Sequence, residues 1–183
     1  ILDTATNPAN YTRGIVLNEI PDTNRGHVSS VQILYSDGTM LITANETIDA
    51  TPTGLVVIEN MTLANNTGDN AISIVGAHIT QVDFTVLTIK LTEKQRVAAI
   101  ALSGTPGGDG GAIIFDMEDA ALQDRSGNYM EEALSLVVNE VPDTVLPRII
   151  SSIIDYTTGL LVISTSETID ITPSSLVKLE KFS

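Results

Sequence analysis

The chain has 183 residues, 43% of them hydrophobic but only 4% aromatic, which is enough apolar content for the core of one average domain or slightly more. Acidic residues outnumber basic ones 23 to 9, for a formal net charge of −14, and because such a surface repels phosphate backbones and anionic lipid headgroups, we expect no nucleic-acid binding and no binding to membrane surfaces. The chain contains no cysteine, so disulfides, cysteine zinc sites and thiol catalysis are excluded, and no apolar run approaches the roughly 20 residues that membrane insertion would require.

The first predicted elements form a hairpin. Residues 28–35 have the β-branched, alternating character of a strand, and residues 40–44 form the returning strand. Asp37-Gly38 is a tight turn between them, because a two-residue hairpin turn needs a residue that accepts positive φ. Residues 55–59 are predicted as a third strand, after a Thr-Pro corner.

The middle of the chain adds short strands, one helix and a loop. Thr92 and Gln95 have the spacing of a capping box, which predicts a short helix through about residue 101. The glycine-rich residues 104–111 form a loop; no Lys-Ser/Thr pair follows them, so a phosphate-binding loop is not expected. The remaining predicted strands are residues 71–75, 79–82, 86–91, 112–115 and 133–138.

This series of elements is typical of one fold class. Short strands with turn signals every 8–12 residues or so, and one short helix, predict an all-β fold, a β-sandwich. The absence of long helical periodicity argues against α/β folds. Because aromatic residues are few, we expect a core of Val, Ile and Leu.

An internal repeat runs through both ends of the chain. Residues 1–62 align with residues 122–183 at a constant offset of 121, without a gap, and 22 of the 62 positions are identical. The longest matches are Asn18–Thr23 with Asn139–Thr144 and Glu46–Asp49 with Glu167–Asp170. A period of this length predicts a repeat unit of domain size.

The repeat predicts the domain boundaries. The two Pro-Asp-Thr segments are interpreted as linkers, since proline stiffens the chain between packed units. We expect residues 1–20 to be the C-terminal end of a preceding repeat, 21–141 a complete repeat, and 142–183 the N-terminal part of the next. The last part lacks a counterpart of residues 63–121, so it needs another stretch of chain, covalent or supplied by a neighbour through strand addition, to close its core.

These motifs together resemble the bacterial-type immunoglobulin-like tandem repeats of large extracellular surface or filament proteins. In that family a domain ends near an Asp-x-x-Gly-Asn turn, which residues 124–128 match, and the next domain begins after an Asp-Thr-x-Pro linker. Residues 143–147 fit that linker loosely, whereas residues 22–25 lack the proline. The resemblance covers essentially the whole chain. It implies that each 121-residue repeat is an immunoglobulin-like β-sandwich. It also implies an extracellular stalk, adhesin, surface layer or filament shaft, and it brings no catalytic residues.

Glycosylation is predicted from four Asn-x-Ser/Thr sequons, all within the first 67 residues; the alternative is that these are polar residues of turns and strand edges. Thr-Pro segments at residues 51–53 and 172–175 are candidate O-glycan sites by composition, or else simple proline corners. The chain opens on Ile1 without a signal-like segment, which we interpret as a removed leader or an excerpt. We expect an extracellular or cell-surface location. The acceptor residues are Asn10, Asn45, Asn60 and Asn65.

Metal binding and catalysis find little support. Carboxylates that stand in the matched motifs are weak candidates for Ca²⁺, which prefers hard oxygen ligands, although aspartates also cap turns and a glutamate can pair with a strand-edge amide. With two histidines and no nucleophile-elbow pattern, we expect no enzyme and no cofactor. His78, beside an apolar segment, is interpreted as a core or edge residue. The candidate ligands are Glu46, Asp49, Asp124 and Asp143, with Glu167 and Asp170 in the second copy.

Three functions compete. The leading hypothesis is a structural segment of a glycosylated extracellular filament or stalk, built from tandem immunoglobulin-like domains, whose partners are covalent glycans and copies of itself or adjacent repeats. The alternative is a cell-surface adhesin that binds carbohydrate or another surface through loops such as 104–111, although four Tyr and no Trp offer little stacking surface. A hydrolase with an appended sandwich would need a catalytic domain outside these residues.

Overall fold

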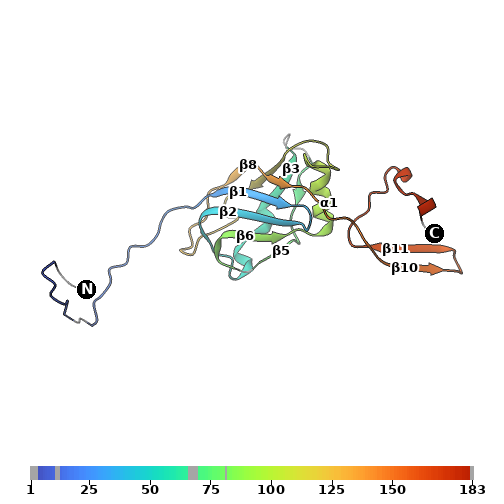
Figure 1. The fold of residues 1–183 in the computed structure, drawn as a ribbon. Coiled ribbons are helices and arrows are strands. Elements are labelled where there is room, and N and C mark those ends of the chain that lie inside the picture. Colours follow the sequence, from blue (N-terminus) through green and yellow to red (C-terminus); the bar gives the residue numbers. More distant parts are fainter. Residues whose placement is uncertain (1–3, 11–12, 66–69, 81, 182–183) are drawn as a thin grey trace.

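Two β-sheets packed face to face form the centre of the molecule, in a computed structural model that describes residues 4–10, 13–65, 70–80 and 82–181 (Figure 1). The first sheet has the strand order β5-β6-β2-β1-β9 and the second the order β4-β3-β7-β8. The first contains β1 (Val28–Leu34), β2 (Thr39–Ile48), β5 (His78–Ile79), β6 (Phe84–Lys90) and β9 (Asn139–Val141). The second contains β3 (Met61–Asn65), β4 (Ile72–Ser73), β7 (Ile113–Met117) and β8 (Ala133–Val137). This mostly β, sandwich-like arrangement agrees with the predicted all-β class.

The sheets are held together by a largely aliphatic core, as the composition predicted. Along β2, the residues Met40, Ile42 and Ala44 are buried and alternate with partly exposed neighbours, which is the pattern of a strand with one face on a core. Two aromatic side chains, Tyr35 and Phe115, are fully buried among the aliphatic ones. All strand pairs in the two sheets are antiparallel except β1 with β9, which run parallel.

The one α-helix among the described residues, α1 (Glu93–Leu102), lies at one end of the sandwich (Figure 1). The predicted capping box is present: the Thr92 hydroxyl accepts from the Gln95 amide, and the Gln95 side chain accepts from the Thr92 amide. The Gln95 side-chain amide also donates to the carbonyls of Ser73 and Val75, at 3.1 and 2.9 Å. These bonds attach the start of α1 to the region of β4.

The third strand was predicted too early in the chain. Residues 55–59 lie instead across two 3₁₀ turns, η1 (Thr53–Leu55) and η2 (Ile58–Asn60), and the strand is β3, from residue 61. Val56 and Ile58 are buried, so the apolar pattern was informative about burial. However, the amides of Val56 and Asn60 bond three residues back along the chain, which is the local pattern of a turn. Similarly, the strand predicted at residues 86–91 begins two residues earlier, since β6 starts at Phe84.

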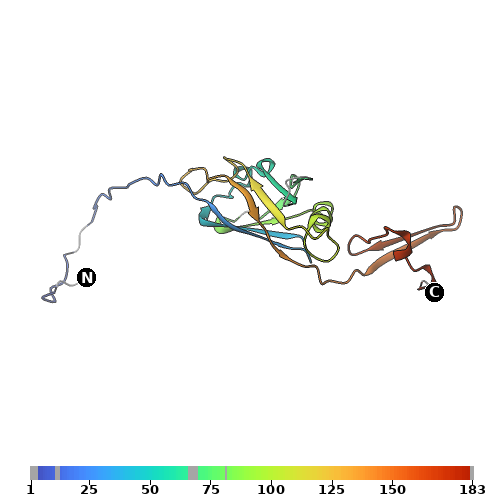
Figure 2. The same cartoon turned by 90° about the horizontal axis from the view of Figure 1, so that it is seen from above.

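The two ends of the chain leave the sandwich in opposite directions (Figures 1 and 2). On one side, residues 4–10 and 13–25 are exposed and form no strand. On the other side, β10 (Ile149–Asp155) and β11 (Leu160–Thr165) form a separate two-stranded hairpin, followed by η3 (Ser174–Leu176) and η4 (Leu179–Lys181). No helix in the described part of the chain is long and apolar enough to span a membrane.

The β10–β11 hairpin has the same strand pairing as β1–β2, 121 residues earlier. Val28 pairs with Ala44 and Ile149 with Thr165, and both hairpins have an irregularity two residues after the first pair. The turn glycines Gly38 and Gly159 have φ of 73° and 69°, as a tight hairpin turn requires. In both copies a cis Thr-Pro bond and a 3₁₀ turn follow the second strand.

The hairpins also share a side-chain contact that the sequence match obscures. The Asn45 carboxamide oxygen accepts from the His27 amide at 2.8 Å, and the Ser166 hydroxyl accepts from the Arg148 amide at 2.9 Å. Asn45 and Ser166 therefore perform the same structural task although they differ in residue type.

Candidate functional site

The end of the sandwich that carries α1 contacts the segment that follows it in the chain, through a buried arginine. Arg96 has only 5% of its surface exposed. Its guanidinium forms two bonds to the Glu93 carboxylate, at 2.8 and 2.9 Å, and one to the Tyr35 carbonyl at 2.9 Å. It also donates to Asp143 at 2.7 Å and to Glu167 at 3.4 Å, both beyond the sandwich. We call Arg96, Glu93, Asp143 and Glu167 the Arg96 joint.

Backbone bonds strengthen the Arg96 joint. The Thr168 amide donates to the Glu93 carboxylate at 2.9 Å, so Glu93 connects α1 both to Arg96 and to the segment after β11. The Val145 amide donates to one oxygen of Asp143 at 2.8 Å, which leaves the other oxygen for Arg96. A pocket of about 510 Å³ lies in the same place, between α1 and residues 167–172.

The contacts in the Arg96 joint shift the pKa values of Glu93, Asp143 and Arg96. The pKa of Glu93 falls to about 2, mainly because Arg96 donates to it. For Asp143, burial acts to raise the pKa, but the Val145 amide and Arg96 outweigh it and the pKa is lowered. Hydrogen bonding to Glu93, followed by Asp143, raises the pKa of Arg96. All of these groups are therefore charged at neutral pH.

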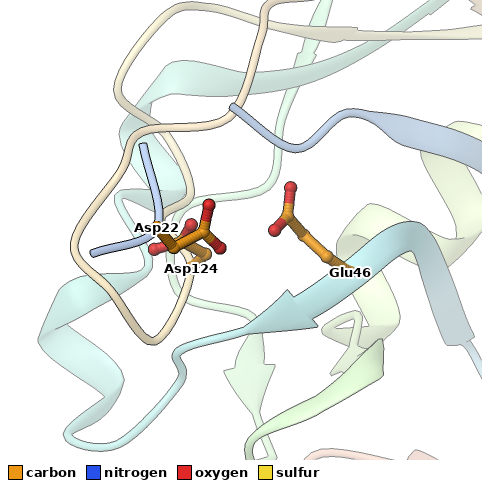
Figure 3. A group of neighbouring side chains, drawn as sticks. All are labelled: Asp22, Glu46 and Asp124. Atoms are coloured by element: carbon orange, nitrogen blue, oxygen red, sulfur yellow. The ribbon is translucent and has the colours of Figure 1, made fainter. Parts of the chain in front are cut away.

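The opposite end of the sandwich carries three carboxylates in one place. Oxygen atoms of Asp22, Glu46 and Asp124 lie within 4.8 Å of one another (Figure 3). Glu46 comes from β2, Asp124 from the segment between β7 and β8, and Asp22 from the chain that enters the sandwich. We call these three residues the acidic cluster. Within residues 4–10, 13–65, 70–80 and 82–181, no lysine or arginine lies at ion-pair distance from any of them.

Local hydrogen bonds position each member of the acidic cluster. Both oxygens of Asp124 accept bonds within its own turn, one from the Ser126 and Asn128 amides and the other from the Asn128 side chain. The same Asn128 side chain donates to the Asp22 carbonyl at 3.2 Å, which attaches the entering chain to the turn. At Gly26 a Cβ atom would overlap the Glu46 side chain, so glycine is what allows Glu46 to lie there.

The surroundings of Glu46 and Asp124 shift their pKa values in opposite directions. Burial raises the pKa of Glu46, and the negative charges of Asp124 and Asp22 raise it further, which outweighs the opposing effect of His27. Burial also acts to raise the pKa of Asp124, but the bonds from Asn128, Ser126 and Gly127 outweigh it and the pKa is lowered. The acidic cluster therefore holds more negative charge than its own contacts compensate, and it is suited to bind a cation or a cationic group.

The four predicted Ca²⁺ ligands separate into two kinds. The structure brings Glu46 and Asp124 together, whereas Asp49 and Asp143 each pair with an arginine. Asp49 accepts from Arg125 at 3.2 Å and from the Thr51 amide at 3.3 Å, and Asp143 belongs to the Arg96 joint. Ca²⁺ takes about 6–8 oxygen ligands, which exceeds what Glu46 and Asp124 supply, and Ca²⁺ binding stays a prediction.

Two participants were missed at the level of sequence. The first was Asp22, which stands 121 residues before Asp143, just as Glu46 stands 121 residues before Glu167. The repeat therefore already marked Asp22 and Glu46 as the counterparts of Asp143 and Glu167. The second was Arg96, which was missed because only the recurring carboxylates were considered as site residues, and not a cation that could pair with them. Its position in the first turn of the capped helix, three residues after Glu93, was the available signal.

The predicted glycan acceptors differ in their surroundings. Asn45 is exposed, and its bond to His27 uses the oxygen and not the nitrogen that would carry a glycan. Asn60 is half-buried, and its side-chain nitrogen donates to the Asp119 carbonyl at 3.3 Å. Asn10 and Asn65 are described, but the rest of each sequon, residues 11–12 and 66–67, lies outside the described residues. Glycosylation of all four stays a prediction.

Two other predicted features lie at the edges of the sandwich. The loop 104–111 packs back on the end of α1, since the Asp109 and Gly110 amides bond to the carbonyls of Ala101 and Ser103. It also lines the pocket at the Arg96 joint. His78 is exposed on the edge strand β5.

Comparison with known proteins gives distant similarity only. No protein-family model matches the chain. No curated protein sequence matches it. The crystal structure of the N-terminal part of the bacterial S-layer protein SbsC is similar with a TM-score of 0.43 and 11% identity, covering 77% of this chain and 33% of that one. The structure of the S-layer protein rSbsC(31-844) gives a TM-score of 0.44 and 12% identity, covering 78% and 18%.

A structure of domains 1–6 of SbsC gives the same values as rSbsC(31-844), a TM-score of 0.44 and 12% identity. The chain spans about a third or less of the length of these surface-layer chains. Similarity at this level assigns neither a family nor an activity.

Proposed function

We propose that the chain is a structural segment of an extracellular or cell-surface array, built from immunoglobulin-like modules repeated every 121 residues. Residues 21–141 form one module in this proposal, and residues 142–183 begin the next. The observation that carries it is the Arg96 joint, in which a buried side chain of one module binds two carboxylates of the following segment. A joint of this kind fixes successive modules, which is what a shaft or layer requires.

The repeated hairpin supports the same proposal. β10–β11 reproduces the pairing of β1–β2 and begins a second sandwich, but it lacks a second sheet in the described chain. Ile154 and Leu161, which stand where the fully buried Ile33 and Met40 stand in the first copy, are 49% and 51% exposed. An apolar face of this type needs a partner, either further chain or a neighbouring copy. The proposal does not depend on the S-layer structures.

Strand addition between copies is one way in which the β10–β11 hairpin, which we call the open hairpin, gains a partner. In the sandwich, β9 pairs parallel with β1 through Asn139 and Gln32, and the Tyr35 hydroxyl donates to Glu140 at 2.7 Å. The counterparts of β9 are residues 18–20, which are exposed. The same pairing would place residues 18–20 of one copy beside β10 of another, with Glu19 accepting from Tyr156.

A cysteine-free chain makes strand addition simple to test. Chains carrying Glu19→Cys are mixed with chains carrying Ile154→Cys under mild oxidation. Their counterparts Glu140 and Ile33 are directly paired across β9 and β1, so a disulfide-linked heterodimer is expected. Thr158→Cys, in the exposed hairpin turn, is the matched control and should give little product. Equal yields from the two mixtures would show that the collisions are unspecific.

The array itself is tested on native material. Electron microscopy should show fibres or a layer with an axial spacing of roughly 40 Å per module, the length of a strand of about 12 residues. Isolated compact particles without regular spacing would contradict the proposal. Intact mass, compared with 19.4 kDa for the unmodified chain, tests the proposed glycans, and peptide mapping assigns them to individual acceptor residues.

An adhesin that binds carbohydrate is the alternative. The loop 104–111 was its predicted contact element, and this loop bonds to the end of α1 and lines the Arg96 joint. In an array the following module would cover one side of it. A glycan-array screen with the 183-residue chain separates the two functions, since specific binding that is lost when the loop is shortened favours the adhesin.

A further inference from the structure

We propose that the acidic cluster is a binding site for an arginine side chain, supplied by the α1 helix of a preceding copy of the same module. The inference deepens the proposed array function and rests on it in one respect, namely that a module precedes residue 21. It assigns the ligand of Asp22 and Glu46 as a guanidinium group and not a metal ion. The partner is a second copy of this module, joined through the linker.

The repeat itself shows which ligand these residues bind. Asp22 and Glu46 stand 121 residues before Asp143 and Glu167. Asp143 and Glu167 both accept hydrogen bonds from Arg96, at 2.7 and 3.4 Å. The second copy of the carboxylate pair therefore holds an arginine of the module before it, within one structure.

The two aspartates are also oriented in the same way. One oxygen of Asp143 accepts from the Val145 amide at 2.8 Å, and one oxygen of Asp22 accepts from the Asn24 amide at 3.0 Å. Asn24 stands 121 residues before Val145. In the second copy, the Asp143 oxygen that does not bind the Val145 amide binds Arg96. The corresponding oxygen of Asp22, which does not bind the Asn24 amide, is therefore available to an equivalent arginine.

Charge balance favours the same ligand. The negative charge of Asp124 is stabilised by its own turn, since both of its oxygens accept bonds there. The carboxylates of the acidic cluster without such bonds to both oxygens are Asp22 and Glu46. Neither has a lysine or arginine partner among the described residues, and their two counterparts share Arg96. A planar guanidinium can bind two carboxylates at once through its separate N–H groups. Ca²⁺ would need several further oxygen ligands.

The test uses the full chain with residues 21–141 duplicated in tandem, so that the first copy's Arg96 faces the second copy's Asp22 and Glu46. Because the chain has no cysteine, spin labels can be placed on single cysteines at the exposed positions Glu132 of the first copy and Glu59 of the second. The distribution of distances between the labels reports how firmly the modules are joined.

We expect a narrow distribution in the duplicated chain. The isosteric double variant Asp22→Asn and Glu46→Gln in the second copy should broaden the distribution. Arg96→Gln in the first copy should broaden it to the same extent. Combining the three substitutions should cause no further broadening, because they remove the same interaction. Arg125→Gln in the second copy is the control, because Arg125 pairs with Asp49 and Asp83 of its own module, and it should keep the narrow distribution. Circular dichroism checks that each variant is folded.

Two results would overturn the proposal. One is an unchanged narrow distribution when Asp22 and Glu46 are neutralised. The other is a narrow distribution that appears only with added Ca²⁺ and is lost with a chelator, which would make the acidic cluster a metal site. Either result leaves the array function standing, since microscopy of native material tests that function independently of this joint.

Discussion

At the scale of single residues, Arg96 concentrates more interactions than any other charged group described here. Replacing it with methionine should lower the free energy of unfolding by about 2–4 kcal/mol, because the Tyr35 carbonyl and the Glu93, Asp143 and Glu167 carboxylates would lose their partner. Urea denaturation measures the change. Lys90→Met, which removes an exposed pair with Asp37 and an exposed bond to the Thr39 hydroxyl, is the control and should cost less than about 1 kcal/mol.

Glu93 gives the Arg96 joint a dependence on pH. Its pKa in the folded chain is lowered from 4.5 to about 2, chiefly by Arg96. A carboxyl group whose pKa is lowered by folding stabilises the fold while it is ionised. The stabilisation is therefore complete well above pH 4.5 and is lost as the pH falls toward about 2.

The variant Glu93→Gln isolates this contribution. The difference in unfolding free energy between the unmodified chain and Glu93→Gln should be largest near neutral pH and should shrink as the pH falls through that range. Denaturant titrations at several pH values measure it. A difference that stays constant with pH would mean that Glu93 acts through shape and not through charge.

At the scale of elements, the start of α1 is fixed by its capping box. Thr92→Ala removes the hydroxyl that accepts from the Gln95 amide, and should destabilise the chain by about 1 kcal/mol. Thr92→Ser keeps the acceptor and should retain most of the stability. Thermal unfolding followed by circular dichroism compares the two variants, and equal losses would show that the methyl group of Thr92 matters more than its hydroxyl.

The loop after α1 depends on one glycine. A Cβ atom at Gly108 would overlap the carbonyl oxygens of Ile100 and Ser103, at the end of the helix. Gly108→Ala should therefore displace the loop and cost about 1–3 kcal/mol. Gly54→Ala is the control, because a Cβ atom there meets nothing within 4 Å. Limited proteolysis within residues 104–111, together with thermal unfolding, detects the displacement.

The sequence predicted elements well where the signal is local. The Asp37-Gly38 turn and the Thr92 capping box are determined by neighbouring residues, and both were found at the predicted positions. The strand predicted at 55–59 failed because burial of Val56 and Ile58 does not require extended pairing. The backbone here instead bonds to a distant part of the chain, since the Ala121 carbonyl accepts from the Val57 amide.

The sequence predicted some residues of the candidate site but not their partners. Recurrence drew attention to Glu46 and Asp143, but the partners of a carboxylate depend on the folded geometry, which brings Arg96 to Asp143 and Asp22 to Glu46. No short motif encodes these contacts, because they join residues that are tens of positions apart.

At the scale of the whole molecule, the two ends of the sandwich are complementary. One end presents the carboxylates of the acidic cluster, and the other presents Arg96 on a short capped helix. A module of this kind can be repeated without a change of interface, because each end matches the opposite end of its neighbour. In the proposed array, the net charge of −14 would keep the sides of neighbouring chains apart while the ends bind.

Net charge also controls whether the open hairpin associates. At neutral pH, repulsion between chains of charge −14 opposes contact, whereas near the sequence pI of 4.2 the repulsion vanishes. We expect the 183-residue chain to associate as the pH approaches that value, through the apolar face of β10–β11. Leu161→Ser, on that face, should shift the onset of association to higher protein concentration.

Ile153 offers the matched control, because it is 68% exposed but stands at the position of Gln32, off the core-facing side of the hairpin. Sedimentation velocity across the pH range compares Leu161→Ser with Ile153→Ser. If the face that would complete a second sandwich drives association, only the Leu161 variant changes its onset appreciably. Equal shifts of the onset in the two variants would mean that any exposed apolar side chain promotes association. The core-facing side of the hairpin would then have no special role.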